Sequence, residues 1–157
     1  MLEATGIRAN TLTLSEKVKD RLLDHPDIID RLKYGQTPGS AVVATMADLA
    51  RLFELDRILV SSAVENTAAQ GAAAEHSFIA GRHALLTHSA PAPGLMVPSA
   101  GYTFSWNGYM GATGLGHRIK TFRMESLASD RVEIEMAFAM KRVAADLGVF
   151  FNNIVAS

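Results

Sequence analysis

The fold of this chain is decided by the stretch Asn10-Thr11-Leu12-Thr13-Leu14-Ser15-Glu16-Lys17-Val18. Up to Leu14, polar and apolar residues alternate, which is the period of a strand. From Leu14 onward the apolar positions lie four residues apart, at Val18 and Leu22, which is the period of a helix. Ser15 stands at the change, where its hydroxyl can accept a hydrogen bond from a free amide of the first helical turn. We therefore predict a short strand that leads directly into a helix over Ser15–Leu23.

Working outward from this stretch, the same two periods recur along the chain. Further helices are predicted over Pro26–Lys33, which ends before a left-handed cap at Gly35, and over Met46–Phe53. The last of these follows Thr45-Met46-Ala47-Asp48, a capping box in which Asp replaces Glu. Short strands are predicted over Arg57–Val64, Ser77–Ile79, His83–His88, Tyr102–Trp106 and His117–Glu125. Three helices and several mostly antiparallel strands predict an α+β fold, with a mixed sheet flanked by helices.

The most regular pattern in the chain is the alternation over Arg131–Val143. At about 3.3 Å per residue this segment would form a strand of about 43 Å, long for a globular protein. The apolar face is expected to lie on the core, and Arg57–Val64 is expected to be a largely buried strand. The apolar face consists of Val132, Ile134, Met136, Phe138 and Met140. The opposite face consists of Glu133, Glu135, Ala137, Ala139 and Lys141.

Composition excludes several classes of protein. The chain has 157 residues, 48% of them hydrophobic, with a net charge of −1 and no cysteine. The absence of cysteine excludes a disulfide scaffold, a thiolate metal site and a cysteine nucleophile. A net charge near zero provides no global attraction for nucleic acid or an anionic membrane, and no apolar run reaches the length of a spanning helix. We therefore expect a soluble, intracellular protein of one compact core.

Three groups of uncharged or weakly charged residues are candidates for a site of chemistry, and each favours a structural interpretation. The glycine-rich segment Gly111–Gly116 lacks Walker spacing and is not followed by a helix, so a plain loop is predicted. His76, His83 and His88 are interpreted as surface histidines, because His83 and His88 differ by an odd number and would leave one strand on opposite faces. The serines lack the Gly-x-Ser-x-Gly elbow of a hydrolase. These serines are Ser61, Ser62, Ser89, Ser99 and Ser105.

Two clusters of charge complete this search. Glu133 and Glu135 would lie about 6.6–7 Å apart on one strand face, a spacing compatible with acid and base catalysis. Since Arg131 and Lys141 share that face, a solvated or intersubunit charge ladder is the preferred interpretation. Basic residues of the C-terminal third are diluted by acidic neighbours, so no specific nucleic-acid site is predicted. These basic residues are Arg118, Lys120, Arg123, Arg131 and Arg142. We predict no catalytic, cofactor or metal residues.

Several longer stretches carry more information than these short motifs. They are TLTLSEKV (11–18), DHPDIIDRLKYG (24–35), ADLARLFELDRILV (47–60), AVENT (63–67), PAPGLMVPSAGYTF (91–104), FRME (122–125), DRVEIEMAF (130–138) and DLGVFF (146–151). In this order they resemble the major capsid proteins of tailed bacteriophages, over almost the whole chain. The resemblance implies an axial domain over 1–128 and returning strands of a peripheral domain over 129–157.

The same resemblance implies a structural role and no enzymatic activity. The expected partners are copies of the same chain, in the hexamers and pentamers of a shell, and the expected location is the virion, with the host cytoplasm before assembly. In that family an N-terminal arm, an extended loop and a spine helix precede these segments, so we predict a fragment or a truncated gene product. Its apolar tail would have lost its cover and could self-associate. The tail residues are Leu147, Val149, Phe150, Phe151, Ile154 and Val155.

One alternative from another functional class stays open at this point. A small α+β domain could bind or hydrolyse a small molecule in a pocket near His76–His88. A pocket with convergent polar groups and a strongly shifted pKa would favour that alternative, whereas exposed surfaces without such a pocket would favour the shell subunit.

Overall fold

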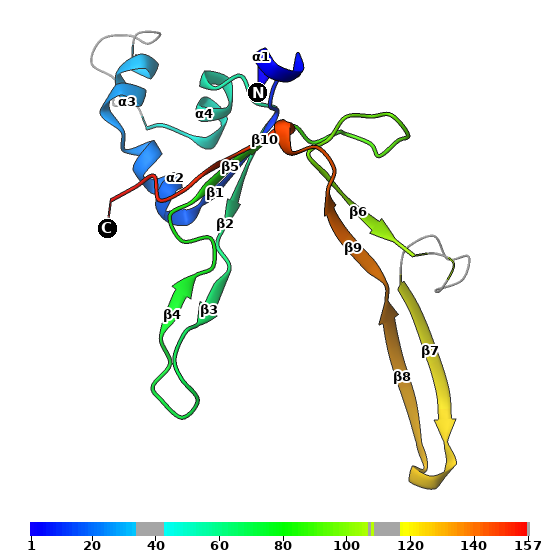
Figure 1. Cartoon of the computed structure of the whole chain (residues 1–157). Helices are drawn as coiled ribbons and strands as arrows, with labels where there is room; N and C mark the ends of the chain where they lie inside the picture. Colours follow the sequence, from blue (N-terminus) through cyan, green and yellow to red (C-terminus); the bar gives the residue numbers. More distant parts are fainter. Residues whose placement is uncertain (34–42, 107, 109–116, 157) are drawn as a thin grey trace. The chain divides into compact units, whose positions relative to one another are not determined.

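A computed structural model describes residues 1–33, 43–106, 108 and 117–156 of the chain (Figure 1). Its contacts divide the chain into two units. The first consists of Met1–Ala100 with Ala144–Ser157, and the second is the insertion Gly101–Val143. Helices and strands are mixed in the fold, and most strand pairs are antiparallel, so the predicted α+β class is confirmed. The predicted boundary between residues 128 and 129 concerns a whole coat subunit and stays a prediction.

The first unit is built on a four-stranded sheet. Strand β1 lies at its centre, parallel to β2 on one side and antiparallel to β5 on the other, and β10 pairs with β5 at the far edge. The strand bounds are β1 Thr11–Ser15, β2 Arg57–Ser61, β5 Ala84–Thr87 and β10 Gly148–Phe151. The order β10-β5-β1-β2 therefore leaves β10 and β2 as the two edges of the sheet.

The three predicted helices begin within a residue of their predicted starts, whereas the short helix α1 (Leu2–Thr5) was not predicted. Ser15 ends β1 and caps α2, because its Oγ accepts a hydrogen bond from the Val18 amide at 3.3 Å. Thr45 and Asp48 form a reciprocal capping box at the start of α4, and the hydrogen bonds from the Thr45 hydroxyl and amide lower the pKa of the Asp48 carboxyl. The cap predicted at Gly35 lies outside the described residues. The helix bounds are α1 Leu2–Thr5, α2 Glu16–Leu23, α3 Pro26–Lys33 and α4 Met46–Leu52.

The core of the first unit lies where β1 turns into α2. Leu12, Leu14, Val18 and Ala84 form one buried cluster. Leu14 and Val18 can meet because Leu14 lies near the end of β1 and Val18 lies in the first turn of α2, so the change of period places both on the same side of the sheet. No described helix has both the length and the apolar character needed to cross a membrane.

Two predictions about the first unit are wrong. The segment Arg57–Val64 does not form one strand: β2 ends at Ser61, and Val64 opens β3 (Val64–Asn66), which pairs with β4 (His76–Phe78) in a separate hairpin. Nor is this segment largely buried, since Leu59 is 47% exposed. The reason is that β2 is an edge strand with a neighbour on one side only.

The apolar tail also differs from its prediction. It forms regular structure: η2 (Ala145–Leu147) leads into β10, and Leu147 is buried. Val155 packs against the core cluster. These two residues have their cover within the chain, whereas Phe150, Phe151 and Ile154 keep much of their surface exposed. The prediction that the whole tail has lost its cover is therefore wrong.

The second unit contains two strand pairs and a short turn. Strand β6 (Gly101–Ser105) pairs with β9 (Phe138–Arg142), and β7 (His117–Met124) pairs with β8 (Ser129–Met136). The turn η1 (Glu125–Leu127) joins β7 to β8. The single long strand predicted over Arg131–Val143 is thus two strands, separated at Ala137. They separate there because the pairing partner changes from β7 to β6.

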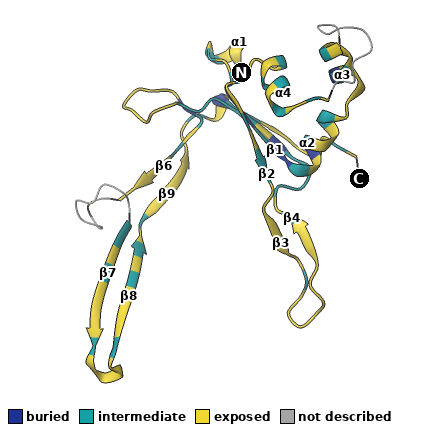
Figure 2. Ribbon diagram, turned by 180° about the vertical axis from the view of Figure 1, so that it is seen from behind, coloured by how far each residue is buried: buried dark blue, intermediate teal, exposed yellow. Residues whose placement is uncertain are grey.

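No described residue of this second unit is buried (Figure 2). The predicted core face of β8 and β9 is exposed, with Ile134 at 63% and Phe138 at 55%. The alternation is real, but its apolar side does not lie on a core of the described chain. A two-stranded hairpin has no second layer against which to bury a face, and is marginally stable by itself in water.

Candidate functional site: exposed apolar surfaces

The β7–β8 hairpin has two chemically different faces. Ile119 stands opposite Ile134, and Thr121 stands opposite Val132, so these side chains share one face. Met136 continues that face. The four large apolar side chains, Ile119, Val132, Ile134 and Met136, are 61–64% exposed. We call this surface the β8 apolar face.

The other face of the same hairpin carries ion pairs. Glu135 accepts hydrogen bonds from Lys120 Nζ at 2.6 Å and from Arg118 Nε at 3.1 Å, and these two cations hold the pKa of its carboxyl below the usual range. Arg131 lies 2.8 Å from Glu133. Each carboxylate is paired with a cation, so a charge ladder is present and Glu133 and Glu135 do not form an acid–base pair with each other. Arg131 belongs to this ladder as predicted, whereas the other predicted member, Lys141, lies in β9 and pairs with β6.

The β6–β9 pair exposes aromatic and apolar groups on both faces. Tyr102 and Phe104 share one face, with ring centroids 6.2 Å apart in an edge-to-face arrangement. Phe138 and Met140 share the other. All of these except Tyr102 are more than half exposed, as is Trp106 beyond the end of β6.

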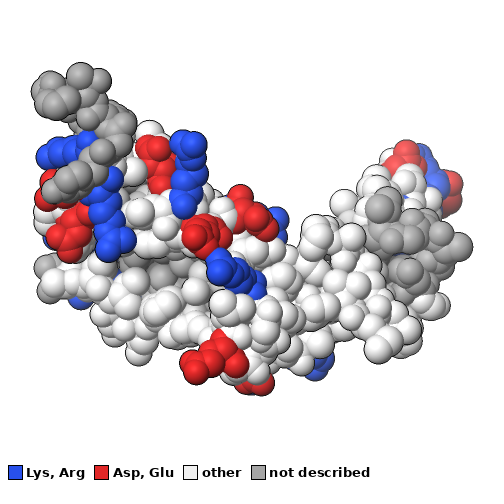
Figure 3. Space-filling model, turned by 90° about the horizontal axis from the view of Figure 1, so that it is seen from above, with Lys and Arg blue, Asp and Glu red and all other residues white. Residues whose placement is uncertain are grey.

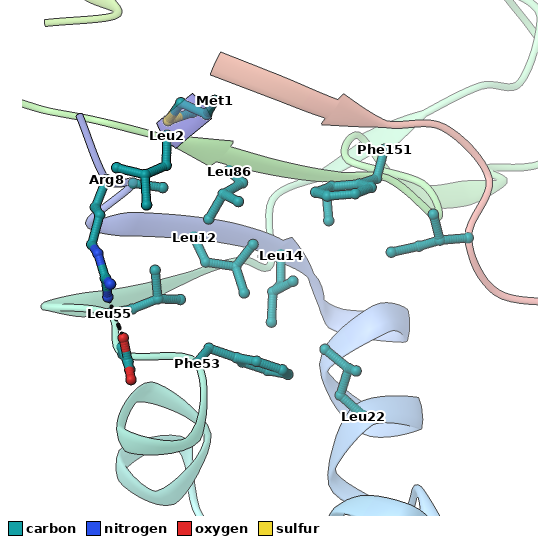
Figure 4. A pocket seen from close by; sticks show the side chains of 14 residues that line it. Met1, Leu2, Arg8, Leu12, Leu14, Leu22, Phe53, Leu55, Leu86 and Phe151 are labelled. Carbon is teal, nitrogen blue, oxygen red and sulfur yellow. Dashed lines mark hydrogen bonds and ion pairs between the residues drawn. The ribbon is translucent and has the colours of Figure 1, made fainter. Parts of the chain in front are cut away.

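A separate apolar pocket lies in the first unit, over the face of the four-stranded sheet (Figure 4). Its volume is about 510 Å³. The side chains point into it from the sheet (Leu12, Leu14, Leu86), from the end of α2 (Leu22) and from the segment after α4 (Phe53, Leu55). Phe151 and Ile154 of the tail also line it. Its ionisable side chains, Arg8 and Glu54, form an exposed salt bridge with each other.

The histidines do not meet. His83 and His88 flank β5 at its two ends, and neither lines the pocket. The Nδ1 atom of His83 accepts a hydrogen bond from the Asn153 amide at 3.2 Å, and its ring lies 5.3 Å from that of Phe150. The Nδ1 atom of His88 lies 2.8 Å from the Arg8 carbonyl oxygen. Within the described ranges, no cluster of His, Asp or Glu is arranged to hold a metal ion.

The remaining candidates are dispersed. Ser99 is buried near the end of the loop that precedes β6, and Ser89 accepts a hydrogen bond from Arg57. The segment Gly111–Gly116 lies outside the described residues. On the face shown in Figure 3, the described acidic and basic side chains are interspersed without an extended basic patch.

The alternative of a pocket near His76–His88 identified only Ala84 and Leu86 of the observed lining, and sequence reasoning missed its other residues. It also missed the loop residues Leu95 and Met96, both 97% exposed. A signal for the loop existed, since two large apolar residues stand next to each other in a proline-rich segment of the sequence. The pocket as a whole had no comparable signal, because its lining comes from six separate segments of the chain.

No family model and no curated protein matches the sequence. Among solved structures, the crystal structure of a phage-related protein from Bordetella bronchiseptica RB50 superposes on 99% of this chain with a TM-score of 0.75 and 23% sequence identity. The two chains share a fold. The present chain spans 48% of the length of that protein. Since the similarity covers both units, the β6–β9 and β7–β8 pairs belong to the shared fold.

Proposed function

We propose that this chain is a structural subunit of the capsid shell of a tailed phage or prophage, whose partners are further copies of itself. The observation that carries the proposal is the second unit, Gly101–Val143. Its described residues include large apolar side chains in alternation, yet none of them is buried. A segment with this pattern is completed by contact with another chain segment.

The two faces of the β7–β8 hairpin support this interpretation. On the charged face, Glu135 accepts hydrogen bonds from Lys120 and Arg118, so these charges are paired within the hairpin. This face is therefore suited to contact with solvent or to the polar rim of an interface. The β8 apolar face has no such compensation. An exposed apolar surface of this kind marks an interaction site or a liability to aggregate. In a shell built from repeated contacts, each copy would cover the apolar face of a neighbour.

The fold comparison supports the same proposal. The neighbour of known structure is described as phage-related, and the stretches in this sequence resemble those of phage major capsid proteins. On this proposal the chain has no catalytic role, it forms hexamers and pentamers, and it is located in the virion. Before assembly it is located in the host cytoplasm.

The pocket does not favour the alternative of a hydrolytic domain. Its lining is apolar apart from Arg8 and Glu54, which neutralise each other at an exposed position. A hydrolytic site needs an acid, a base or a nucleophile within hydrogen-bond reach of the reacting atom. The histidines near this region are engaged with backbone groups and do not line the pocket.

The proposal is tested by sedimentation velocity of the 157-residue chain over a wide concentration range, with electron microscopy of the associated fraction. We expect the average mass to rise with concentration, and we expect rings or curved sheets in the images. A chain that stays monomeric at every concentration would contradict the proposal. Straight tubes would support a phage structural protein outside the shell, and would contradict the capsid role.

A further inference from the structure

The loop between β5 and β6, residues 88–100, presents two apolar side chains at its tip. Leu95 and Met96 are each 97% exposed. The base of the loop is closed by a hydrogen bond from the Ala100 amide to the His88 carbonyl at 2.9 Å. Within the tip, the Val97 amide donates to the Gly94 carbonyl at 3.4 Å. We call Leu95 and Met96 the apolar knob.

The backbone of the knob is held in an unfavourable conformation. Met96 has φ of 63°, in the left-handed region that non-glycine residues rarely adopt. The turn is tight, since a Cβ on Gly94 would lie 2.8 Å from Val97 Cγ2. Three prolines in the same loop, Pro91, Pro93 and Pro98, restrict it further. Strain of this kind is retained where the surrounding structure enforces it, and it accumulates at binding sites.

The apolar pocket of the first unit is the complementary feature on the same molecule. Its volume of about 510 Å³ lies in the range of pockets that enclose a ligand. It is open at the surface, because Phe53, Phe151 and Ile154 of its lining are each more than a third exposed. The knob is almost fully exposed in its own chain, so it does not occupy the pocket of the same copy.

We propose that the apolar knob of one copy inserts into the apolar pocket of a second copy. The proposal rests on the proposed function, and it names a second contact through which copies associate, in addition to the β8 apolar face. Each chain carries one knob and one pocket at different places, so the contact is heterologous, and repetition of it closes into a ring or continues as an open array. It also gives the exposed tail residues Phe151 and Ile154 a role, since they line the pocket that receives the neighbour.

The test uses single-cysteine variants, because the natural chain contains no cysteine. Met96→Cys places a thiol on the knob, and Phe53→Cys places one at the pocket. The two variants, one of them tagged, are mixed and treated with a short bismaleimide linker. A mixture of single-cysteine chains can form a tagged–untagged pair only between two copies. Val64→Cys replaces Phe53→Cys in the control, because Val64 is a comparably exposed apolar residue outside the pocket.

We expect the mixture of Met96→Cys with Phe53→Cys to give at least about tenfold more cross-linked pairs than the control mixture. The reason is that burial of large apolar side chains at a contact changes the association constant by at least about tenfold. The double substitution of Leu95 and Met96 by Asp should weaken association of the chain by more than about tenfold. Equal yields in the two mixtures would overturn the proposal.

The results separate this contact from the proposed function. If the parent chain associates but the two mixtures cross-link equally, the knob contact is wrong and the shell role stands. If the cross-link forms selectively but microscopy shows straight tubes, the contact stands and the capsid role is wrong. If a small apolar probe dye binds the pocket of the parent and the cross-link is not selective, the pocket is a ligand site and the proposal is overturned.

Discussion

Replacing Ile134 by Asp distinguishes a face that contacts other copies from a face of the chain's own core. The Ile134 side chain is 63% exposed, so the folded chain buries only about a third of it. Full burial of such a side chain is worth about 1.5–3 kcal/mol, which leaves about 1–2 kcal/mol to be gained against another copy. The four side chains of the β8 apolar face are exposed to the same degree, and together they offer at most about 4–8 kcal/mol.

The substitution should therefore affect the isolated chain and its association differently. We expect Ile134→Asp to change the free energy of unfolding by less than about 1 kcal/mol, as for a surface position. Leu14→Ala, at a core residue that is 1% exposed, should cost about 2–5 kcal/mol. At an interface the new carboxylate would be buried without a partner, so association should weaken by more than about tenfold.

Chemical denaturation measures the first quantity, and sedimentation equilibrium measures the second. Glu133→Gln is the matched control, because it alters the charged face of the same strand and leaves the apolar face intact. If Ile134→Asp destabilised the chain as much as Leu14→Ala, the β8 apolar face would belong to the chain's own core. If Ile134→Asp associated as strongly as the parent, this face would not be an interface.

Three further predictions concern single features of the fold. Thr45→Ala should lower the free energy of unfolding by about 1 kcal/mol, measured by thermal or chemical unfolding. Because the pKa of the Asp48 carboxyl is lowered in the folded chain, the stability due to this cap is present above about pH 3.9 and is lost as the pH falls through the folded pKa. The difference in stability between the variant and the parent should therefore shrink in acid. Gly101→Ala should speed hydrogen exchange of the β9 amides, because its Cβ would lie 2.9 Å from the Lys141 carbonyl oxygen, whereas Gly148→Ala makes only an ordinary contact at 3.6 Å and should not alter exchange in β10. Zinc or a chelator should leave the melting temperature unchanged, and a zinc-dependent rise abolished by replacing either histidine beside β5 would refute this.

Local chemistry explains which parts of the fold could be predicted. The capping hydroxyl of Ser15, the capping box of Thr45 and the proline that opens α3 each act within one turn of the chain. Their effect does not depend on the rest of the fold, so α2, α3 and α4 fall within a residue or two of their predicted bounds.

The strands were predicted less well because alternation specifies faces and leaves the pairing partner open. The same alternation runs from β8 through Ala137 into β9, although β8 pairs with β7 and β9 with β6. A pattern of apolar residues also does not say which molecule covers it. The sequence pattern of Arg131–Val143 is the same whether its apolar side packs on the core of its own chain or on a neighbouring copy.

The candidate surfaces depend on residues far apart in the sequence. Leu12, Leu22, Phe53 and Phe151 meet in one pocket only after the sheet and its helices have formed. Charges were easier to predict, since Glu133 and its cation Arg131 lie two residues apart in one strand. The cations of Glu135, Arg118 and Lys120, lie in the adjacent strand, and this pairing was not predicted.

The chain has the hydrophobic content of a globular domain, but its buried hydrophobic residues lie in one of its two units only, as far as the described residues show. This difference bears on function. Nearly half of the residues are hydrophobic, as in an ordinary globular domain. Among the described hydrophobic residues, however, the buried ones are confined to the first unit and its tail. The apolar residues of the second unit alternate in strands and are spaced as in a protein interior, yet they lie on the surface of the chain. Because apolar surface gains free energy only when water is removed from it, contact with another chain would supply the stabilisation that an internal core supplies elsewhere. Folding of this unit and assembly of the copies would then be coupled, so the stability of the hairpins would depend on the concentration of the chain.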